Sequence, residues 1–98
     1  MNINATKNEN ELTVELEGRL DTTTAPDLEA YINEHLEDVT TLIYDMAGLE
    51  YISSAGLRVL LSSQKKMSAK GEMKVRNVNE TIMEIFEVTG FSDILDIE

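Results

Sequence analysis

The sequence predicts one α/β domain in which helices pack around a mixed sheet of four to five strands. Segments whose apolar residues alternate with polar ones are interleaved with segments whose apolar residues recur every three or four positions, the periods of strands and helices respectively. The chain has 98 residues, a usual size for one domain. It contains no linker or internal repeat, so we expect residues 1–98 to form one unit.

Two alternating segments at the start of the chain predict a β-hairpin. Leu12, Val14 and Leu16 alternate with polar residues, as in a strand with one solvated face. Residues 3–6 form a weaker segment of the same kind, and residues 8–10 supply turn-forming side chains.

A helix is predicted from about Thr24 onward. Thr24 is a suitable N-cap residue, and Pro26 fits the first helical turn. Apolar residues recur at helical spacing on one side of this segment: Ala25, Leu28, Ile32 and Leu36.

The middle of the chain predicts a central strand followed by a second helix. Residues 41–44 form a nearly continuous apolar run that ends at Asp45, and we expect this strand to be covered on both faces. Residues 47–48 predict a turn, and residues 49–52 lead to a helix that starts near Ser53 and Ser54 and stops before Gly71.

The rest of the chain predicts a strand at residues 72–76, a helix capped by Asn79 and ended by Gly90, and a short C-terminal segment that docks onto the domain. The order is therefore β-β-α-β-α-β-α. Strands that alternate with helices favour a largely parallel sheet, in which ligands and partners meet the loops after the strands. Those loops are residues 18–24, 45–54 and 76–79.

Composition excludes several classes of function. The net charge is −11, and there is no cysteine, which excludes disulfides, thiolate metal sites and a cysteine nucleophile. No apolar run is long enough for a membrane helix, and no signal peptide is recognisable. We expect a cytoplasmic protein that binds neither membrane nor metal nor a tight cofactor.

The few basic residues are concentrated. Residues 58–76 hold six bases and one acid, whereas residues 1–57 hold twelve acids and two bases, and residues 77–98 hold six acids and no base. Such a cluster could bind nucleic acid, but cations along one helix and the next strand are more often a solvated face. We therefore expect no nucleic-acid partner.

The most unusual local sequence is Ser53-Ser54-Ala55-Gly56-Leu57, at the predicted start of the second helix. Backbone N–H groups at a helix start favour an anion, so a phosphoryl group on Ser54 could be held there. The simpler interpretation of the spacing alone is that Ser54 caps the helix and Gly56 makes room for packing.

Residues 49–61 resemble the signature of the STAS superfamily, specifically of bacterial anti-sigma factor antagonists. Residues 16–21 resemble the family's Gly-x-Leu-Asp turn, residues 42–45 resemble the strand before its phosphorylation loop, and residues 77–90 fit its last helix. The resemblance covers essentially the whole chain and implies a single STAS domain over residues 1–98.

The resemblance implies a regulatory binding module and not an enzyme. Such proteins bind an anti-sigma factor that is often a serine kinase, and so release a sigma factor. Phosphorylation of one serine weakens the binding, and a PP2C-type phosphatase restores it. Family members commonly carry Asp-Ser-Ser-Gly at this site. Aligned on Gly56, the Asp falls on Ser53, the phosphorylated serine on Ser54 and the second serine on Ala55, so Ser53 departs from the pattern.

Fold position and the resemblance together predict a partner-binding surface on a monomer. Its residues are Asp21, Thr22, Thr23, Ser53, Ser54, Ala55, Gly56, Arg58 and Ser62.

Three other readings are possible. A serine hydrolase is disfavoured because the only histidine, His35, lies on the first helix and there is no Gly-x-Ser-x-Gly elbow. A receiver-like regulator would use Asp45 as phosphoacceptor, or as a metal ligand with Asp21, but a turn-capping aspartate is commoner. A STAS-fold scaffold without any phosphoswitch is the third.

Overall fold

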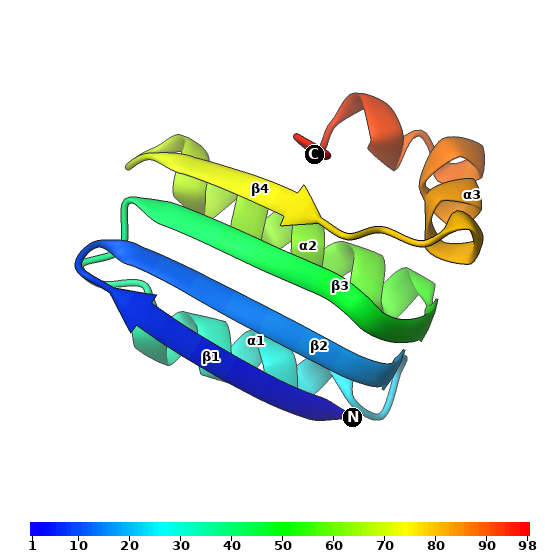
Figure 1. The fold of residues 1–98 in the computed structure, drawn as a ribbon, viewed down its shortest axis with the longest axis horizontal. Coiled ribbons are helices and arrows are strands. Elements are labelled where there is room, and N and C mark those ends of the chain that lie inside the picture. Colours follow the sequence, from blue (N-terminus) through cyan, green and yellow to red (C-terminus); the bar gives the residue numbers. More distant parts are fainter.

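The computed structural model describes residues 1–98 and contains four strands, three α-helices and a short 3₁₀ helix (Figure 1). The element order confirms the predicted β-β-α-β-α-β-α arrangement. The elements are β1 (Asn2–Asn8), β2 (Glu11–Leu20), α1 (Ala25–His35), β3 (Thr41–Ile52), α2 (Ser54–Ser68), β4 (Glu72–Arg76), α3 (Glu80–Thr89) and η1 (Phe91–Asp93).

The sheet is mixed, and its strands lie in the order β1-β2-β3-β4. β1 and β2 form the predicted antiparallel hairpin, whereas β2–β3 and β3–β4 are parallel. Beyond β4, the C-terminal segment adds only one bridge, between Val75 and Ile97, with backbone hydrogen bonds of 2.9 Å from Val75 N to Asp96 O and 2.8 Å from Glu98 N to Val75 O. The predicted range of four to five strands thus resolves to four strands and one bridge.

The main core lies between one face of the sheet and helices α1 and α2, both of which are behind the sheet in Figure 1. Leu16, Tyr44 and Leu60 are fully buried in it, together with Leu28 and Ile32 of α1. Helix α3 lies beyond the ends of β3 and β4 and contributes Ile82 and Phe86 to the same core. Helices therefore cover one face and one end of the sheet.

The expectation that the strand at residues 41–44 is covered on both faces is confirmed, because Leu42, Ile43 and Tyr44 are at most 2% exposed, although no helix lies over the opposite face (Figure 1). Ile43 points to that face and is nevertheless only 2% exposed. Its register neighbours are Thr13 on β2 and Lys74 on β4. Long side chains from neighbouring strands can cover one apolar residue, so a short apolar run does not require a second layer of helices.

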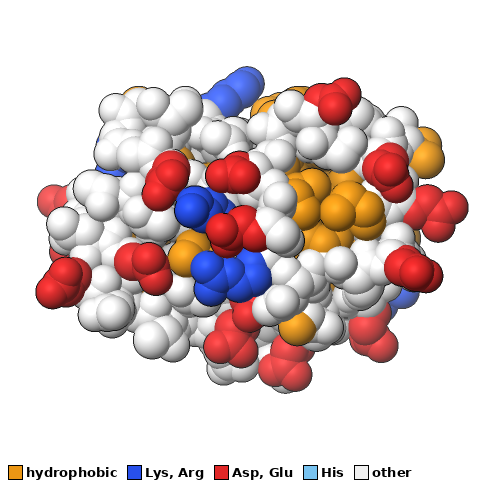
Figure 2. Space-filling view, turned by 45° about the horizontal axis from the view of Figure 1, so that its top comes forward, with side chains coloured by type: hydrophobic (Ala, Val, Ile, Leu, Met, Phe, Trp, Pro, Cys, Tyr) orange, Lys and Arg blue, Asp and Glu red, His pale blue; other side chains and the backbone are white.

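The uncovered face is polar. On this face Lys74 and Arg76 both pair with Glu98, at 3.7 and 3.3 Å. Figure 2, which views this side obliquely, shows Lys and Arg side chains beside Asp and Glu near the middle of the view, and an apolar patch to the right of them.

The predicted turn at residues 47–48 was also wrong, because β3 continues to Ile52. The register with β2 shifts between Glu15 and Glu17, next to Gly48. A Cβ atom on Gly48 would lie 2.8 Å from Cγ of Glu17 and 3.2 Å from the carbonyl oxygen of Leu16. The glycine thus permits a close approach inside an irregular strand pair and does not end the strand.

No helix of the structure has the length and apolarity needed to cross a membrane.

Candidate functional site

Two of the predicted loops meet at the carboxyl ends of β2 and β3. Leu20 pairs with Ile52 in the parallel ladder, and the N–H of Ser53 donates to the carbonyl oxygen of Leu20 at 2.9 Å. The chain then enters α1 from β2 and α2 from β3, so the starts of both helices lie side by side. The third predicted loop, residues 76–79, lies on the other side of β3, where Asn79 Nδ2 donates to the carbonyl oxygen of Leu49 at 2.8 Å.

Asp21 organises the loop before α1. Its Oδ1 accepts hydrogen bonds from the backbone N–H and the hydroxyl of Thr23, at 3.0 and 2.7 Å, and from the N–H of Thr24 at 3.2 Å. The Thr23 hydroxyl is the largest of the influences that hold the pKa of the Asp21 carboxyl below its usual value. Thr24 occupies the predicted N-cap position but makes no side-chain cap bond, and its hydroxyl donates to the carbonyl oxygen of Arg19 at 2.8 Å.

The start of α2 differs from the simpler sequence interpretation. Ser53, not Ser54, is the N-cap residue, with extended backbone angles (φ −97°, ψ 177°) and no side-chain cap bond. The Oγ atom of Ser53 is buried without a hydrogen-bond partner. Ser54 is the first residue of the helix and is exposed, so its hydroxyl can be reached by another protein.

Gly56 is buried under the same helix start. A Cβ atom at this position would lie 2.7 Å from Cγ of Leu20 and 2.8 Å from Cγ1 of Ile52. Real side chains do not pack at such distances, so the absence of a side chain lets α2 lie close to the ends of β2 and β3. Gly56 therefore supports the site by letting the start of α2 approach the sheet, and it is itself buried and cannot contact a partner.

A shallow groove of about 480 Å³ runs between the first turns of α1 and α2. Four of the predicted partner-binding residues line it: Thr22, Ala55, Arg58 and Ser62. The sequence reasoning missed the wall contributed by α1, where Pro26 and Glu29 also line the groove. Glu29 lies on the polar side of the predicted helix, and only the pairing of β2 with β3 shows that this residue adjoins α2.

A second cluster of side chains borders the site on the uncovered face of the sheet. The guanidinium of Arg19 lies 4.4 Å from the centre of the Tyr51 ring, its register partner on β3. The Nε atom of Arg19 is 3.8 Å from Oδ2 of Asp21. Arg19 is thus held by a cation–π contact and a weak ion pair, whereas Arg58 in the groove makes no ion pair.

Asp45 does not join this site. Its Oδ1 accepts from the N–H of Ala47 at 3.0 Å and from Nδ2 of Asn77 at 3.1 Å. It pairs in register with Glu15, well before the carboxyl end of β2, so it does not converge with Asp21. Asp45 therefore bonds to its own strand and to the loop after β4.

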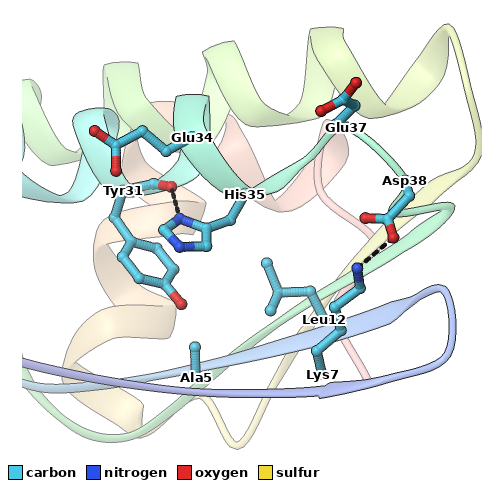
Figure 3. A pocket seen from close by; sticks show the side chains of 8 residues that line it. All are labelled: Ala5, Lys7, Leu12, Tyr31, Glu34, His35, Glu37 and Asp38. Atoms are coloured by element: carbon cyan, nitrogen blue, oxygen red, sulfur yellow. Dashed lines mark hydrogen bonds and ion pairs between the residues drawn. The ribbon is translucent and has the colours of Figure 1, made fainter.

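His35 lies in a separate pocket of about 240 Å³ between the hairpin and the end of α1 (Figure 3). Its ring stacks on Tyr31 with centroids 4.0 Å apart, and its Nδ1 lies 2.7 Å from the carbonyl oxygen of Tyr31. A carbonyl oxygen only accepts, so Nδ1 carries the hydrogen. No hydroxyl other than that of Tyr31 lines the pocket, and Ser54 is not among its residues, so His35 is not placed to activate the serine.

The chain is similar to known proteins over nearly its whole length. The model of the STAS domain family matches residues 2–98. The anti-sigma-B factor antagonist of Bacillus subtilis (strain 168) is 30% identical over 98 residues, which cover 99% of this chain and 90% of that protein. This confirms the family resemblance found in the sequence.

Solved structures show the same fold. A crystal structure of an anti-sigma factor antagonist from Mycobacterium paratuberculosis superposes with a TM-score of 0.88 at 22% identity, covering 98% of this chain and 83% of that one. The Bacillus cell fate determinant SpoIIAA in its phosphorylated form superposes with a TM-score of 0.77 at 20% identity, covering 99% and 91%.

Proposed function

The chain belongs to the STAS domain family, and from that premise we propose that it is an anti-sigma factor antagonist. It binds an anti-sigma factor and thereby releases a sigma factor. The anti-sigma factor is also a serine kinase that phosphorylates Ser54, and a PP2C-type phosphatase reverses the modification. The proposal includes a monomeric protein in the cytoplasm that carries no catalytic activity of its own.

The observation that carries the proposal is the exposed hydroxyl of Ser54 beside the groove. Ser54 occupies the position of the phosphorylated serine in the family's motif. The groove supplies a docking surface that combines the small side chain of Ala55 with the polar side chains of Thr22, Arg58 and Ser62. A partner seated across both helix starts would cover Ser54.

The switch follows from charge. Transfer of the γ-phosphoryl group of ATP to Oγ of Ser54 releases the hydroxyl proton and ADP, and hydrolysis by the phosphatase consumes water and releases inorganic phosphate. A phosphoserine adds about −1.5 to −2 charges at pH 7. In an interface over the helix start these charges add repulsion and desolvation cost. A coupling of about 1–3 kcal/mol changes affinity by about 5- to 150-fold, which is enough for a switch without refolding.

The test uses a candidate anti-sigma factor kinase from the same organism and compares three variants with the wild type. Ser54→Ala should bind the kinase with unchanged affinity and accept no phosphate, and Ser54→Asp should bind at least about fivefold more weakly. Ser68→Asp adds the same charge at the far end of α2 and should bind like the wild type.

Mass spectrometry after incubation with ATP locates the phosphate. Phosphate on Ser54 supports the proposal. Equal affinities of the wild type and Ser54→Asp, or phosphate on another residue, would contradict the proposed switch.

A STAS-fold interaction module without phosphorylation is the second candidate. It is favoured by Ser53, which stands where the family motif has aspartate and whose Oγ atom has no hydrogen-bond partner. If this candidate is right, the wild type takes up no phosphate from ATP when it is incubated with the partner. Ser54→Asp still weakens binding, because Ser54 lies in the contact surface.

A further inference from the structure

Arg58 is a free cation placed one helical turn after Ser54. It is exposed on α2, lines the groove between α1 and α2, and makes neither an ion pair nor a side-chain hydrogen bond. The only other charged side chain that lines the groove is Glu29 of α1, and it is not within ion-pair distance of Arg58. Every other arginine of the chain, Arg19 and Arg76, is paired.

Helix geometry brings Arg58 toward Ser54. Residues four positions apart lie on the same face, with Cβ atoms about 6 Å from each other. Side chains in a helix lean toward its N-terminus, so the long arm of Arg58 extends over the first turn of α2. An acidic group that precedes a basic one by four residues is the favourable orientation for such a pair.

We propose that Arg58 binds the phosphate of phosphorylated Ser54 within the same helix, an inference that rests on the proposed function for the modification itself. The planar guanidinium offers two parallel N–H donors to two phosphate oxygens. The unpaired N–H groups of the first helical turn add to the same site. Phosphorylation then has two effects on partner binding. It adds negative charge at Ser54, and it engages the Arg58 guanidinium, which in the unmodified chain is free to bind an acidic group of the partner.

This arrangement predicts what happens when Arg58 is absent. Arg58→Gln weakens binding of the unmodified chain to the kinase partner, because the groove loses its cation. Phosphorylation of Ser54 then lowers the affinity for the partner by a smaller factor, because the variant has no Arg58 cation left to lose. In a double-mutant cycle the two changes are therefore less than additive.

The direct test needs no partner. Phosphoserine is installed at position 54 by chemical synthesis of the 98-residue chain, and its titration is followed by ³¹P NMR. An arginine that binds the dianion lowers the pH at which the phosphate takes up a proton and becomes the monoanion. Arg58→Gln should raise the titration midpoint by about 0.3 pH unit, as expected for an ion pair on a helix surface. Arg58→Lys should restore part of the difference.

Lys65→Gln is the matched control, because it removes the same charge from the same helix two turns farther on. Equal midpoints in the Arg58→Gln chain and the parent chain, or an equal rise in Lys65→Gln, would overturn the proposal. The proposed function fails separately, if the phosphorylated chain binds its partner as tightly as the unmodified one. In that case the ³¹P result still decides whether Arg58 binds the phosphate.

Discussion

The hydroxyl of Tyr44 lies 2.8 Å from Oγ of Ser63, in the core between β3 and α2. The Ser63 hydroxyl donates to the carbonyl oxygen of Val59 at 2.9 Å, so its single hydrogen is used. Tyr44 must therefore be the donor to Ser63. Burial raises the pKa of the Tyr44 hydroxyl and keeps it protonated. This two-step network fixes the middle of the helix that begins at Ser54 to the central strand.

Ser63→Ala should lower the free energy of unfolding by about 1–3 kcal/mol, because it leaves a buried tyrosine hydroxyl without an acceptor. Tyr44→Phe should lower it by about 1 kcal/mol. Once Tyr44 is replaced by Phe, Ser63→Ala lowers the free energy of unfolding by less, because no tyrosine hydroxyl is left without an acceptor. The double variant is therefore more stable than the sum of the two single effects predicts. Urea unfolding of all four proteins measures this coupling, and strictly additive effects would show that the bond contributes nothing.

Gly56→Ala should destabilise the domain although alanine is the better helix former. The new methyl group meets the side chains of Leu20 and Ile52, both essentially unexposed, and overpacking of this kind costs about 1–3 kcal/mol. The gain in helix propensity is at most about 1 kcal/mol. We expect a net loss of about 1–2 kcal/mol in chemical denaturation, and a variant more stable than the wild type would refute the close approach.

The N-caps of α2 and α3 should respond differently to alanine. Asn79 accepts from the N–H of Ile82 at 2.9 Å and also donates to Leu49, so Asn79→Ala should cost about 1–2 kcal/mol. Ser53 makes no cap bond, and Ser53→Ala should cost less than about 0.5 kcal/mol. Thermal unfolding compares the two, and equal losses would mean that Ser53 caps its helix in solution.

The loop before α1 should weaken in acid. Because the pKa of Asp21 is lower in the folded chain than its usual value, the stabilisation by its carboxylate is complete above that value and is lost as the pH falls through the folded pKa. Asp21→Asn should therefore be less stable than the wild type near pH 6, and the difference should shrink as the pH falls below the usual pKa of an aspartate. A stability difference between the two proteins that stays the same from pH 6 into acid would contradict this role of the ionised carboxylate.

Partner binding should depend on salt. The proposed site lies at the boundary between residues 1–57, with twelve acids and two bases, and residues 58–76, with six bases and one acid. Complementary charges on a partner raise the association rate, and ions screen this effect. We expect the affinity for the anti-sigma factor to fall as ionic strength rises. The same affinity at low and high salt would show that the uneven charge distribution plays no part in partner binding.

Local sequence patterns were enough to predict the order of strands and helices. Most of the apolar residues that recur within residues 12–16, 25–36 and 57–67 are the ones that face the core from β2, α1 and α2. Local patterns failed where contacts between distant segments decide. Gly48 suggests a turn in the sequence, yet in the structure its lack of a Cβ atom allows the close approach of Glu17 where the pairing of β2 and β3 is irregular. The surroundings of Ile43 likewise cannot be seen from its own segment, because its register neighbours, Thr13 and Lys74, come from two other strands.

The candidate site shows the same division between local and distant contacts. Ser54 and Arg58 follow from the sequence signature and helical spacing, whereas Glu29 enters the groove only through the pairing of β2 with β3.

The strand order in the sheet is the order of the strands in the chain. No strand has to be inserted between two that are already paired, so a chain leaving the ribosome can add each new strand to the free edge of those already formed. The outer edge of β4 exchanges two backbone hydrogen bonds at Val75 with Asp96 and Glu98, which follow α3 in the chain. This part of the edge is therefore paired only after α3 and the segment beyond it have been made, and until then it can pair with strands of other chains.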